Sequence, residues 1–305
     1  VYAIPRDIPQ PEIVAKQLAS LLGLPLETLR KQLSSQSSFV WLDRQVVPDK
    51  MAQLRALDLP GIHTMMETRR FYPKRHLAGQ LLGFVGVDEQ GLGGLEQRYD
   101  HDLSGTSRQV IGQVDARRRR VRLLDGEDAA NPRGANLHLT LDERLQYIAE
   151  KELDEAVRAT RAKGGIVVVM EPKTGAVLAL AVSPRFDPNE IKSLSADRWR
   201  NRALTDVYEP GSTMKVFVAA AALEEKIMTP TTSVYAEQGE MTVAGTVIHD
   251  HERYGWLTFS QVIEKSSNIG AAKTGMALGE HRLYRYLRAF GFGERTEVDL
   301  PGEVA

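Results

Sequence analysis

A serine, a lysine and a short serine–asparagine segment are the residues of this sequence with the clearest chemical potential. Ser212 and Lys215 stand three residues apart in the stretch Tyr208-Glu-Pro-Gly-Ser-Thr-Met-Lys215. Pro210 and Gly211 precede the serine and mark the start of a helix. Because residues three apart share one face of a helical turn, the spacing predicts a serine nucleophile with a lysine in reach of its proton.

The expected helix start would assist acyl transfer in two ways. Free backbone N–H groups at a helix N-terminus can hold a developing oxyanion. The following residues, Val216–Leu223, are apolar on every side, which predicts a helix buried in the middle of the protein. Burial beside such a helix lowers the pKa of a lysine and frees its amine as a base. Taken alone, however, a serine at this position is more often a simple helix cap.

A second polar segment, Lys265-Ser-Ser-Asn268, supplies the groups that such a pair would need. The hydroxyl of Ser266 can relay a proton between Lys215, Ser212 and a leaving amine. The carboxamide of Asn268 can bind a substrate amide and hold Lys215. A second helix cap is the competing interpretation, since serine and asparagine before an apolar run also begin helices.

The two motifs together resemble the active-site set of penicillin-recognising serine enzymes. The sequence around them resembles class B penicillin-binding proteins, which are peptidoglycan D,D-transpeptidases, and is closest to their division-specific septal branch. The stretches that carry this resemblance are Tyr208–Lys215, Lys265-Ser-Ser-Asn-Ile-Gly270, Phe290-Gly-Phe-Gly293 and Asp299-Leu-Pro-Gly-Glu303.

The first half of the chain resembles the pedestal domain of the same family. Arg70-x-Tyr72-Pro73 and Gly91-x-x-Gly94-x-Glu96 carry this likeness. It implies a structural, interdomain role for Arg70 and Glu96, paired across the domain core. Val1-Tyr-Ala-Ile-Pro5 resembles the stretch that follows the family's membrane anchor. The resemblance therefore implies a bacterial inner-membrane protein with a single-pass anchor, absent from this chain, and domains in the periplasm or otherwise outside the cytoplasm.

The implied fold is α+β, with two domains. A dimerisation-type pedestal domain would occupy residues 1–135, and an incomplete penicillin-binding α/β domain of the serine β-lactamase-like type would occupy residues 136–305. The boundary falls in Asp125–Gly134, a polar stretch with Asn-Pro and Gly breakers.

The elements expected to support the second domain are a helix and a hairpin. Thr140-Leu-Asp-Glu143 predicts a capping box for a helix that ends near Thr160. Gly165–Met170 and Val177–Val182 flank the turn Glu171–Gly175 and predict a β-hairpin. Both strands are apolar on both faces, which predicts helices on both sides of the sheet.

One motif of the family is missing. A third segment, K-T-G or K-S-G on an inner strand, should bind the substrate carboxylate. Lys173-Thr-Gly175 falls in the hairpin turn, and Lys273-Thr-Gly275 continues the helix after Asn268. We therefore expect a chain truncated at both ends, poorly folded in its C-terminal half and catalytically weak or inactive by itself.

Composition excludes several other classes. The 305 residues carry a formal net charge of −1 and no cysteine, which argues against nucleic-acid binding, thiol catalysis and cysteine-based zinc sites. The basic cluster Arg117–Arg120 predicts a solvated edge. His249-Asp-His251 has no third well-spaced ligand, so no metal site is expected. Trp256 and Phe259 are expected in the core rather than as glycan platforms.

The resemblance implies a two-step acyl transfer without a cofactor. Ser212 would attack the D-Ala-D-Ala carbonyl of a peptidoglycan stem peptide, and an amine of a neighbouring stem would accept the acyl group. β-Lactam antibiotics would acylate the same serine, and divisome proteins including a glycosyltransferase would be partners. Two alternatives stay open: a β-lactam sensor or hydrolase with the same serine chemistry, and a non-catalytic cell-wall scaffold that acts through residues 1–135.

Overall fold

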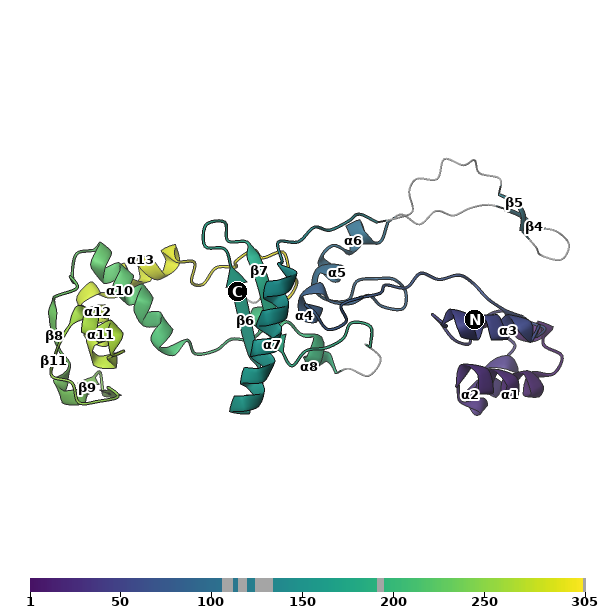
Figure 1. Cartoon of the computed structure of the whole chain (residues 1–305), viewed down its shortest axis with the longest axis horizontal. Helices are drawn as coiled ribbons and strands as arrows, with labels where there is room; N and C mark the ends of the chain where they lie inside the picture. Colours follow the sequence, from purple (N-terminus) through teal and green to yellow (C-terminus); the bar gives the residue numbers. More distant parts are fainter. Residues whose placement is uncertain (106–111, 115–119, 124–133, 191–194, 304–305) are drawn as a thin grey trace. The chain divides into compact units, whose positions relative to one another are not determined.

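The computed structural model describes residues 1–105, 112–114, 120–123, 134–190 and 195–303 (Figure 1). They divide into two compact units, Val1–Ala203 and Leu204–Ala305. Of the predicted boundary stretch Asp125–Gly134, residues 125–133 lie outside the described residues, so that boundary stays a prediction. The basic residues 117–119 lie outside them as well.

The first unit begins with a small sheet packed on helices. Strand β1 (Tyr2–Ala3) pairs antiparallel with β2 (Val40–Trp41) and β3 (Ile62–His63), in the order β2-β1-β3. Helices η1 (Pro5–Asp7), α1 (Pro11–Leu22), α2 (Leu26–Leu33) and α3 (Pro48–Ala56) complete this part. Leu18, Leu29 and Leu33 are fully buried between the helices. With Val14, Ala15 and Leu22 of α1 they belong to one buried cluster, which gives this region a core of its own.

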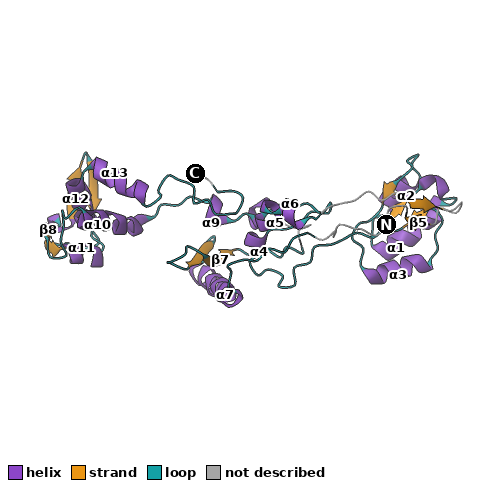
Figure 2. Ribbon diagram, turned by 90° about the horizontal axis from the view of Figure 1, so that it is seen from above, coloured by secondary structure: helices purple, strands orange, loops and turns teal. Residues whose placement is uncertain are grey.

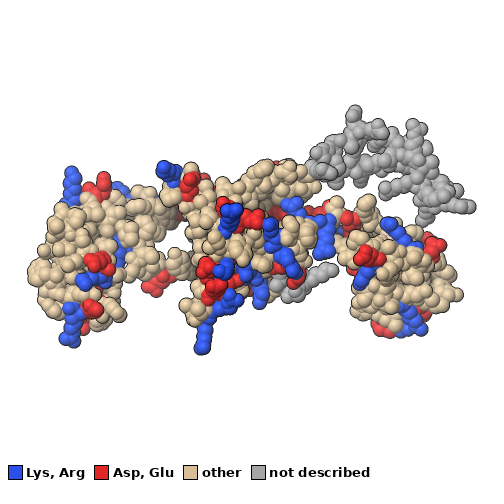
Figure 3. All heavy atoms as spheres, viewed as in Figure 1, with Lys and Arg blue, Asp and Glu red and all other residues tan. Residues whose placement is uncertain are grey.

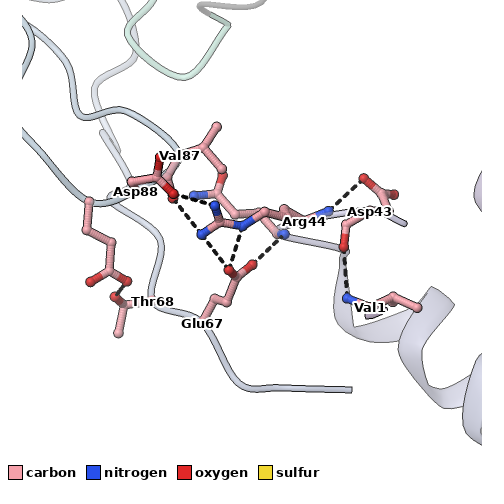
Figure 4. A network of polar contacts seen from close by, with 9 residues as sticks. Val1, Asp43, Arg44, Glu67, Thr68, Val87 and Asp88 are labelled. Carbon is pink, nitrogen blue, oxygen red and sulfur yellow. Dashed lines mark hydrogen bonds and ion pairs between the residues drawn. The ribbon is translucent and has the colours of Figure 1, made fainter. Parts of the chain in front are cut away.

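Ionic contacts join the segments that follow this small sheet (Figure 4). Arg44 donates from Nε to Glu67 Oε1 at 2.7 Å and also binds Asp88. The Glu67 carboxylate accepts in addition from the backbone N–H of Gln45 at 3.1 Å. The hydrogen bond from Arg44 lowers the pKa of Glu67. The network therefore ties residues near 44, 67 and 88 to one another.

Short helices and close backbone contacts form the middle of this unit. Helices α4 (Gly79–Leu82), α5 (Gly94–Arg98) and α6 (Asp100–Leu103) are followed by the antiparallel strands β4 (Gly112–Val114) and β5 (Arg120–Leu123). Gly83 has a φ of +78°, and a Cβ there would lie 1.7 Å from the carbonyl oxygen of Gly93. Only glycine allows this approach.

The long helix and the hairpin also belong to the first unit. Helix α7 (Glu143–Thr160) packs on strands β6 (Gly165–Met170) and β7 (Val177–Ser183), which pair antiparallel and confirm the predicted hairpin (Figures 1 and 2). The predicted capping box is wrong. Asp142 is the N-cap and accepts from the N–H groups of Arg144 and Leu145, whereas the Thr140 hydroxyl donates to the Val177 carbonyl at 2.6 Å.

The prediction that helices cover both faces of this hairpin is also wrong for the described residues. Helix α7 covers one face through a cluster formed by Ala149, Leu153, Ala179, Ala181, Val167 and Val169. On the other face Ile166, Val168 and Met170 of β6 remain 39%, 46% and 51% exposed. A run of apolar residues indicates that a strand tends to be buried, but it does not show which element covers each face.

The second unit is a helical cluster with two small sheets. Helix α8 (Ala196–Trp199) is the last helix wholly within the first unit, and α9 (Arg202–Thr205) spans the division between the units. The elements of the second unit are η3 (Gly211–Met214), α10 (Lys215–Glu224), β8 (Ser233–Tyr235), η4 (Glu237–Gly239), β9 (Glu240–Val243), β10 (Thr246–His249), β11 (Trp256–Thr258), α11 (Phe259–Glu264), α12 (Asn268–Leu278) and α13 (Glu280–Ala289). Strand β9 pairs with β10, and β8 pairs with β11.

Helix α10 packs on α12 and α13 through only part of its surface. Ala221 and Ala222 are fully buried in the core of this unit. Val216 and Leu223 are 61% and 43% exposed, so the predicted burial of the whole helix is wrong within the described unit. A helix sequence that is apolar on every side does not show which of its sides pack against other elements.

The aromatic prediction holds for one residue of two. Phe259 is 3% exposed and belongs to the core, as predicted, whereas Trp256 is 71% exposed and rests against Tyr235 with ring centroids 5.2 Å apart. The end of a two-stranded ribbon leaves this indole uncovered.

The described surface is mixed in charge. Figure 3 shows Lys and Arg interspersed with Asp and Glu over the visible face of both units. None of the helices in the described ranges is both long enough and apolar enough to cross a bilayer.

Candidate active site

The serine and the lysine lie at a junction between two kinds of helix. Ser212 belongs to the short 3₁₀ helix η3, and Lys215 is the first residue of α10. Gly211 turns the chain into this junction with a φ of +58°, a conformation that favours glycine. Ser212 is exposed and Lys215 is half-buried. The junction therefore presents the hydroxyl outward while the lysine stem packs inward.

The serine–asparagine segment is a tight link between two helices. Helix α11 begins with a capping box between Thr258 and Gln261 and ends at Glu264. Ser266 then takes a left-handed conformation, with a φ of +54°. Ser267 is the N-cap of α12, and its Oγ accepts from the Gly270 N–H at 2.9 Å. Ser266 therefore lies in the link between the helices, and Asn268 is the first residue of α12.

The lysine joins both segments through three hydrogen bonds. Its Nζ lies 2.6 Å from the Ser266 carbonyl oxygen, 3.0 Å from Ser266 Oγ and 2.6 Å from Asn268 Oδ1. Ser266 Oγ lies 2.9 Å from Ser212 Oγ. A continuous chain of hydrogen bonds therefore leads from Ser212 through Ser266 to Lys215.

These contacts suit both protonation states of the lysine. An ammonium has three N–H donors, and three acceptors surround Nζ. A neutral amine has two donors and one lone pair. The two donors can keep the Ser266 carbonyl and Asn268, while the lone pair accepts from the Ser266 hydroxyl, which is free to rotate. A proton can thus pass between Ser266 and Lys215 with little movement of the heavy atoms.

The surroundings shift Lys215 towards its neutral form. Burial lowers the pKa of Lys215, because removal from water disfavours the ammonium. The negative charge of Asp250 opposes this effect and raises the pKa. The net direction is downward, as a lysine base requires.

The hydrogen bonds found among the described residues follow the route that the sequence suggested for a proton relay. They run from Ser212 through Ser266 to Lys215. Ser212, Lys215, Ser266 and Asn268 all lie in the second unit and are brought together. Their catalytic roles remain proposals.

Sequence reasoning missed one residue of this site. Asp250 binds Ser267 Oγ at 2.6 Å and the Ile269 N–H at 3.0 Å. The carbonyl of the neighbouring His249 accepts from Asn268 Nδ2 at 2.8 Å. The signal was present in His249-Asp-His251, which we had considered only as a metal motif. No cluster of potential metal ligands occurs among the residues that the structure describes.

Both K-T-G sequences lie where the sequence predicted. Lys173-Thr-Gly175 forms the turn between β6 and β7, and Gly175 has a φ of +75°. Lys273-Thr-Gly275 belongs to α12. Lys273 Nζ is bound to the Tyr235 carbonyl at 2.7 Å and to Glu237. Neither sequence stands on a strand beside Ser212.

Arg70 and Glu96 lie in the first unit and contact each other. Arg70 Nε donates to Glu96 Oε1 at 2.7 Å, and the Tyr72 hydroxyl donates to the same oxygen at 3.2 Å. The Glu96 side chain is 8% exposed. Burial and the Glu96 carboxylate raise the pKa of Tyr72. An interdomain role for the pair stays a prediction.

Comparison with known proteins gives matches over most of the chain. Residues 1–139 match the model of the penicillin-binding protein dimerisation domain, and residues 165–305 match that of the penicillin binding protein transpeptidase domain. Stage V sporulation protein D of Bacillus subtilis is 34% identical over 99% of this chain and 48% of its own length. Peptidoglycan D,D-transpeptidase FtsI of Escherichia coli is 36% identical over 94% of this chain and 49% of its own length.

A solved structure shows the same likeness. Penicillin binding protein 3 of Mycobacterium tuberculosis is similar with a TM-score of 0.66 and 32% identity, over 78% of this chain and 50% of that one. The present chain thus spans about half the length of the curated relatives it matches.

Proposed function

Because the chain belongs to the class B penicillin-binding proteins, with a dimerisation domain followed by a transpeptidase domain, we propose that it supplies the serine nucleophile of a peptidoglycan D,D-transpeptidase. The observation that carries this proposal is the hydrogen-bond chain from Ser212 through Ser266 to Lys215. A hydroxyl linked to an amine of lowered pKa is an activated nucleophile.

The first half-reaction forms an acyl-enzyme. Ser212 Oγ attacks the carbonyl carbon of the penultimate D-Ala of a stem peptide, and the C–N bond to the terminal D-Ala breaks. The Ser212 proton moves through Ser266 to the neutral amine of Lys215 and then to the nitrogen of the leaving D-Ala. Free D-Ala departs, and an ester on Ser212 remains.

The second half-reaction forms the cross-link. An amine of a neighbouring stem peptide attacks the ester carbonyl, and the C–O bond to Ser212 breaks. One proton of the attacking amine returns to Ser212 Oγ through Lys215 and Ser266. The new amide links two stems, and Ser212, Ser266 and Lys215 recover their starting states.

Asn268 is placed to orient the substrate. Its Oδ1 accepts from Lys215, and one N–H of Nδ2 donates to the His249 carbonyl. An amide nitrogen has a second N–H, which can donate to a peptide carbonyl of the substrate. Asn268 would therefore bind the stem peptide while it holds the lysine.

β-Lactam antibiotics are proposed as inhibitors of the same serine. A β-lactam presents an amide whose C–N bond opens on attack by Ser212, yet the nitrogen stays attached to the acyl group and cannot diffuse away. Solved complexes of the similar Mycobacterium protein contain aztreonam and ampicillin. This supports β-lactams as ligands of the present chain.

The cellular setting is part of the proposal. The name FtsI of one relative supports a septal role with divisome partners including a glycosyltransferase, while another relative is named for sporulation. Peptidoglycan stems lie outside the cytoplasm, so the domains would face the periplasm or cell exterior from an inner-membrane anchor.

The test is acylation of the protein expressed from its complete gene. A fluorescent penicillin should label the wild type and add its mass to Ser212, and Ser212→Ala should abolish the label. Ser260→Ala, at an exposed serine of α11, serves as control and should leave labelling intact. A label that persists in Ser212→Ala contradicts the proposal. Rapid release of hydrolysed penicillin would indicate a hydrolase, and no label on any variant would favour a scaffold.

A further inference from the structure

Two consecutive residues at the end of β10 hold the serine–asparagine turn from outside. The His249 carbonyl accepts from Asn268 Nδ2 at 2.8 Å. The Asp250 carboxylate accepts from Ser267 Oγ at 2.6 Å and from the Ile269 N–H at 3.0 Å. Three hydrogen bonds thus join His249 and Asp250 to the three successive residues Ser267, Asn268 and Ile269.

The carboxylate spans the residue that contacts the lysine. Ser267 and Ile269 lie on either side of Asn268, and each is bound by a different oxygen of Asp250. Ser267 is 1% exposed and Ile269 is fully buried. Since both neighbours are fixed, the backbone at Asn268 has little freedom to rotate.

The arrangement goes beyond ordinary helix capping. Ser267 is itself the N-cap of α12, through its bond to the Gly270 N–H. Asp250 lies 17 residues before Ser267 in the chain and binds this capping residue. A carboxylate that only capped α12 would bind free backbone N–H groups, whereas Asp250 also binds the side chain of the capping residue Ser267.

The turn that is held in this way is conformationally demanding. Ser266 has a φ of +54°, which few residues other than glycine adopt readily. Its carbonyl and hydroxyl must both face Lys215 Nζ, at 2.6 and 3.0 Å. A backbone held in a sparsely populated conformation persists only when its surroundings determine it.

We propose that Asp250 is a positioning residue of the acyl-transfer site, which fixes the Ser266–Asn268 turn so that its hydroxyl, carbonyl and carboxamide meet Lys215. This inference rests on the proposed function. Asp250 touches neither the nucleophile nor the substrate in this scheme. It acts through geometry: in holding the turn, its carboxylate serves as a pair of fixed acceptors rather than as a charge.

Two substitutions separate position from charge. Asp250→Asn keeps the length of the side chain: its Oδ1 can accept from Ile269, and its Nδ2 can donate to Ser267 Oγ, which has a second lone pair. Asp250→Glu keeps the charge but moves the oxygens outward by one methylene. Glu252→Gln, at an exposed carboxylate two residues away, is the matched control.

The experiment measures acylation of the protein expressed from its complete gene by a fluorescent penicillin. Stopped-flow traces at the pH of maximal rate give the dissociation constant of the first complex and the acylation rate constant separately. We expect Asp250→Glu to lower the acylation rate constant on the order of 100-fold, as a misplacement of about 1 Å does. The dissociation constant should change little, and Asp250→Asn should stay within about tenfold of the wild type.

The outcomes are distinct. A wild-type rate constant in Asp250→Glu overturns the inference, and so does a larger loss in Asp250→Asn than in Asp250→Glu, which would indicate a role for the charge. A purely structural role would lower the thermal midpoint and the fraction of protein that labels, but leave the rate constant of the labelled fraction unchanged, which also overturns it. If the proposed function fails, the wild type itself will not be labelled at Ser212.

Discussion

Lys215 Nζ lies 2.6 Å from Asn268 Oδ1, although 53 residues separate the two along the chain. The contact joins the first residue of α10 to the first residue of α12. Because these helices pack against each other, their starts meet, and Ser266 falls between the lysine and the nucleophile. The second unit therefore holds the proposed acyl-transfer groups on two adjacent helix starts.

Acylation should depend on pH through Lys215. The lysine acts as a base only when neutral, so the rate should rise with pH and level off above its pKa. Burial lowers that pKa, so the inflection should lie below about 10.4, the value of an unperturbed lysine. The measurement is the acylation rate constant for a fluorescent penicillin over pH. A rate that is constant down to the pH of unfolding would exclude this base.

Replacement of the lysine by arginine should remove the base and keep the charge. Arginine stays protonated at any pH the protein tolerates, so Lys215→Arg should lower the acylation rate constant by about 10³-fold. Lys226→Arg, at an exposed lysine of the same unit, should match the wild type. Equal rates for wild type and Lys215→Arg would show that another group takes the proton.

Loss of the charge on Asp250 should shift the pH profile downward. The negative charge of Asp250 raises the pKa of Lys215, so Asp250→Asn should move the inflection to lower pH. The sign follows because the ammonium loses a favourable neighbour. The same pH series, run on this variant and on Glu252→Gln, checks the shift. An inflection that moves upward would contradict it.

The Arg70–Glu96 pair should contribute to stability in the first unit. Glu96 is 8% exposed in its side chain and serves both Arg70 and the Tyr72 hydroxyl. Its removal leaves a buried hydroxyl without its acceptor, so Glu96→Ala should cost about 1–3 kcal/mol. Glu143→Ala breaks the exposed pair with Lys74, whose side chains are 61% and 64% exposed, and should cost at most about 1 kcal/mol. Urea unfolding of both variants measures the difference.

A buried glutamine should fasten α7 to β7. Gln146 is 1% exposed, donates to the Leu180 carbonyl at 2.9 Å and accepts from the Leu180 N–H at 2.8 Å. Gln146→Leu leaves both backbone groups unpaired, so we expect a loss of about 2–4 kcal/mol in the free energy of unfolding. Glu152→Leu, at an exposed position of the same helix, should change it by less than about 0.5 kcal/mol. Equal losses of unfolding free energy in Gln146→Leu and Glu152→Leu would show that the two hydrogen bonds to Leu180 add no stability.

The sequence by itself determined the features that depend on neighbouring residues. Pro210 and Gly211 before the serine predicted the helix start, and the Pro/Gly turn at Glu171–Gly175 predicted the hairpin. The two K-T-G sequences could be assigned to a turn and a helix for the same reason. Turn and helix-start preferences act over a few residues, so a linear chain displays them.

Only the tertiary structure decided which groups those elements meet. The role of Asp250 beside Ser267 and the choice of Asp142 over Thr140 as a cap both depend on partners from distant segments. A side chain that can donate or accept has many possible partners in a sequence, and packing selects one. The exposed sides of α10 and β6 could not be predicted for the same reason. Hydrophobicity measures the tendency of a side chain to be buried, but it does not specify the element that packs against it.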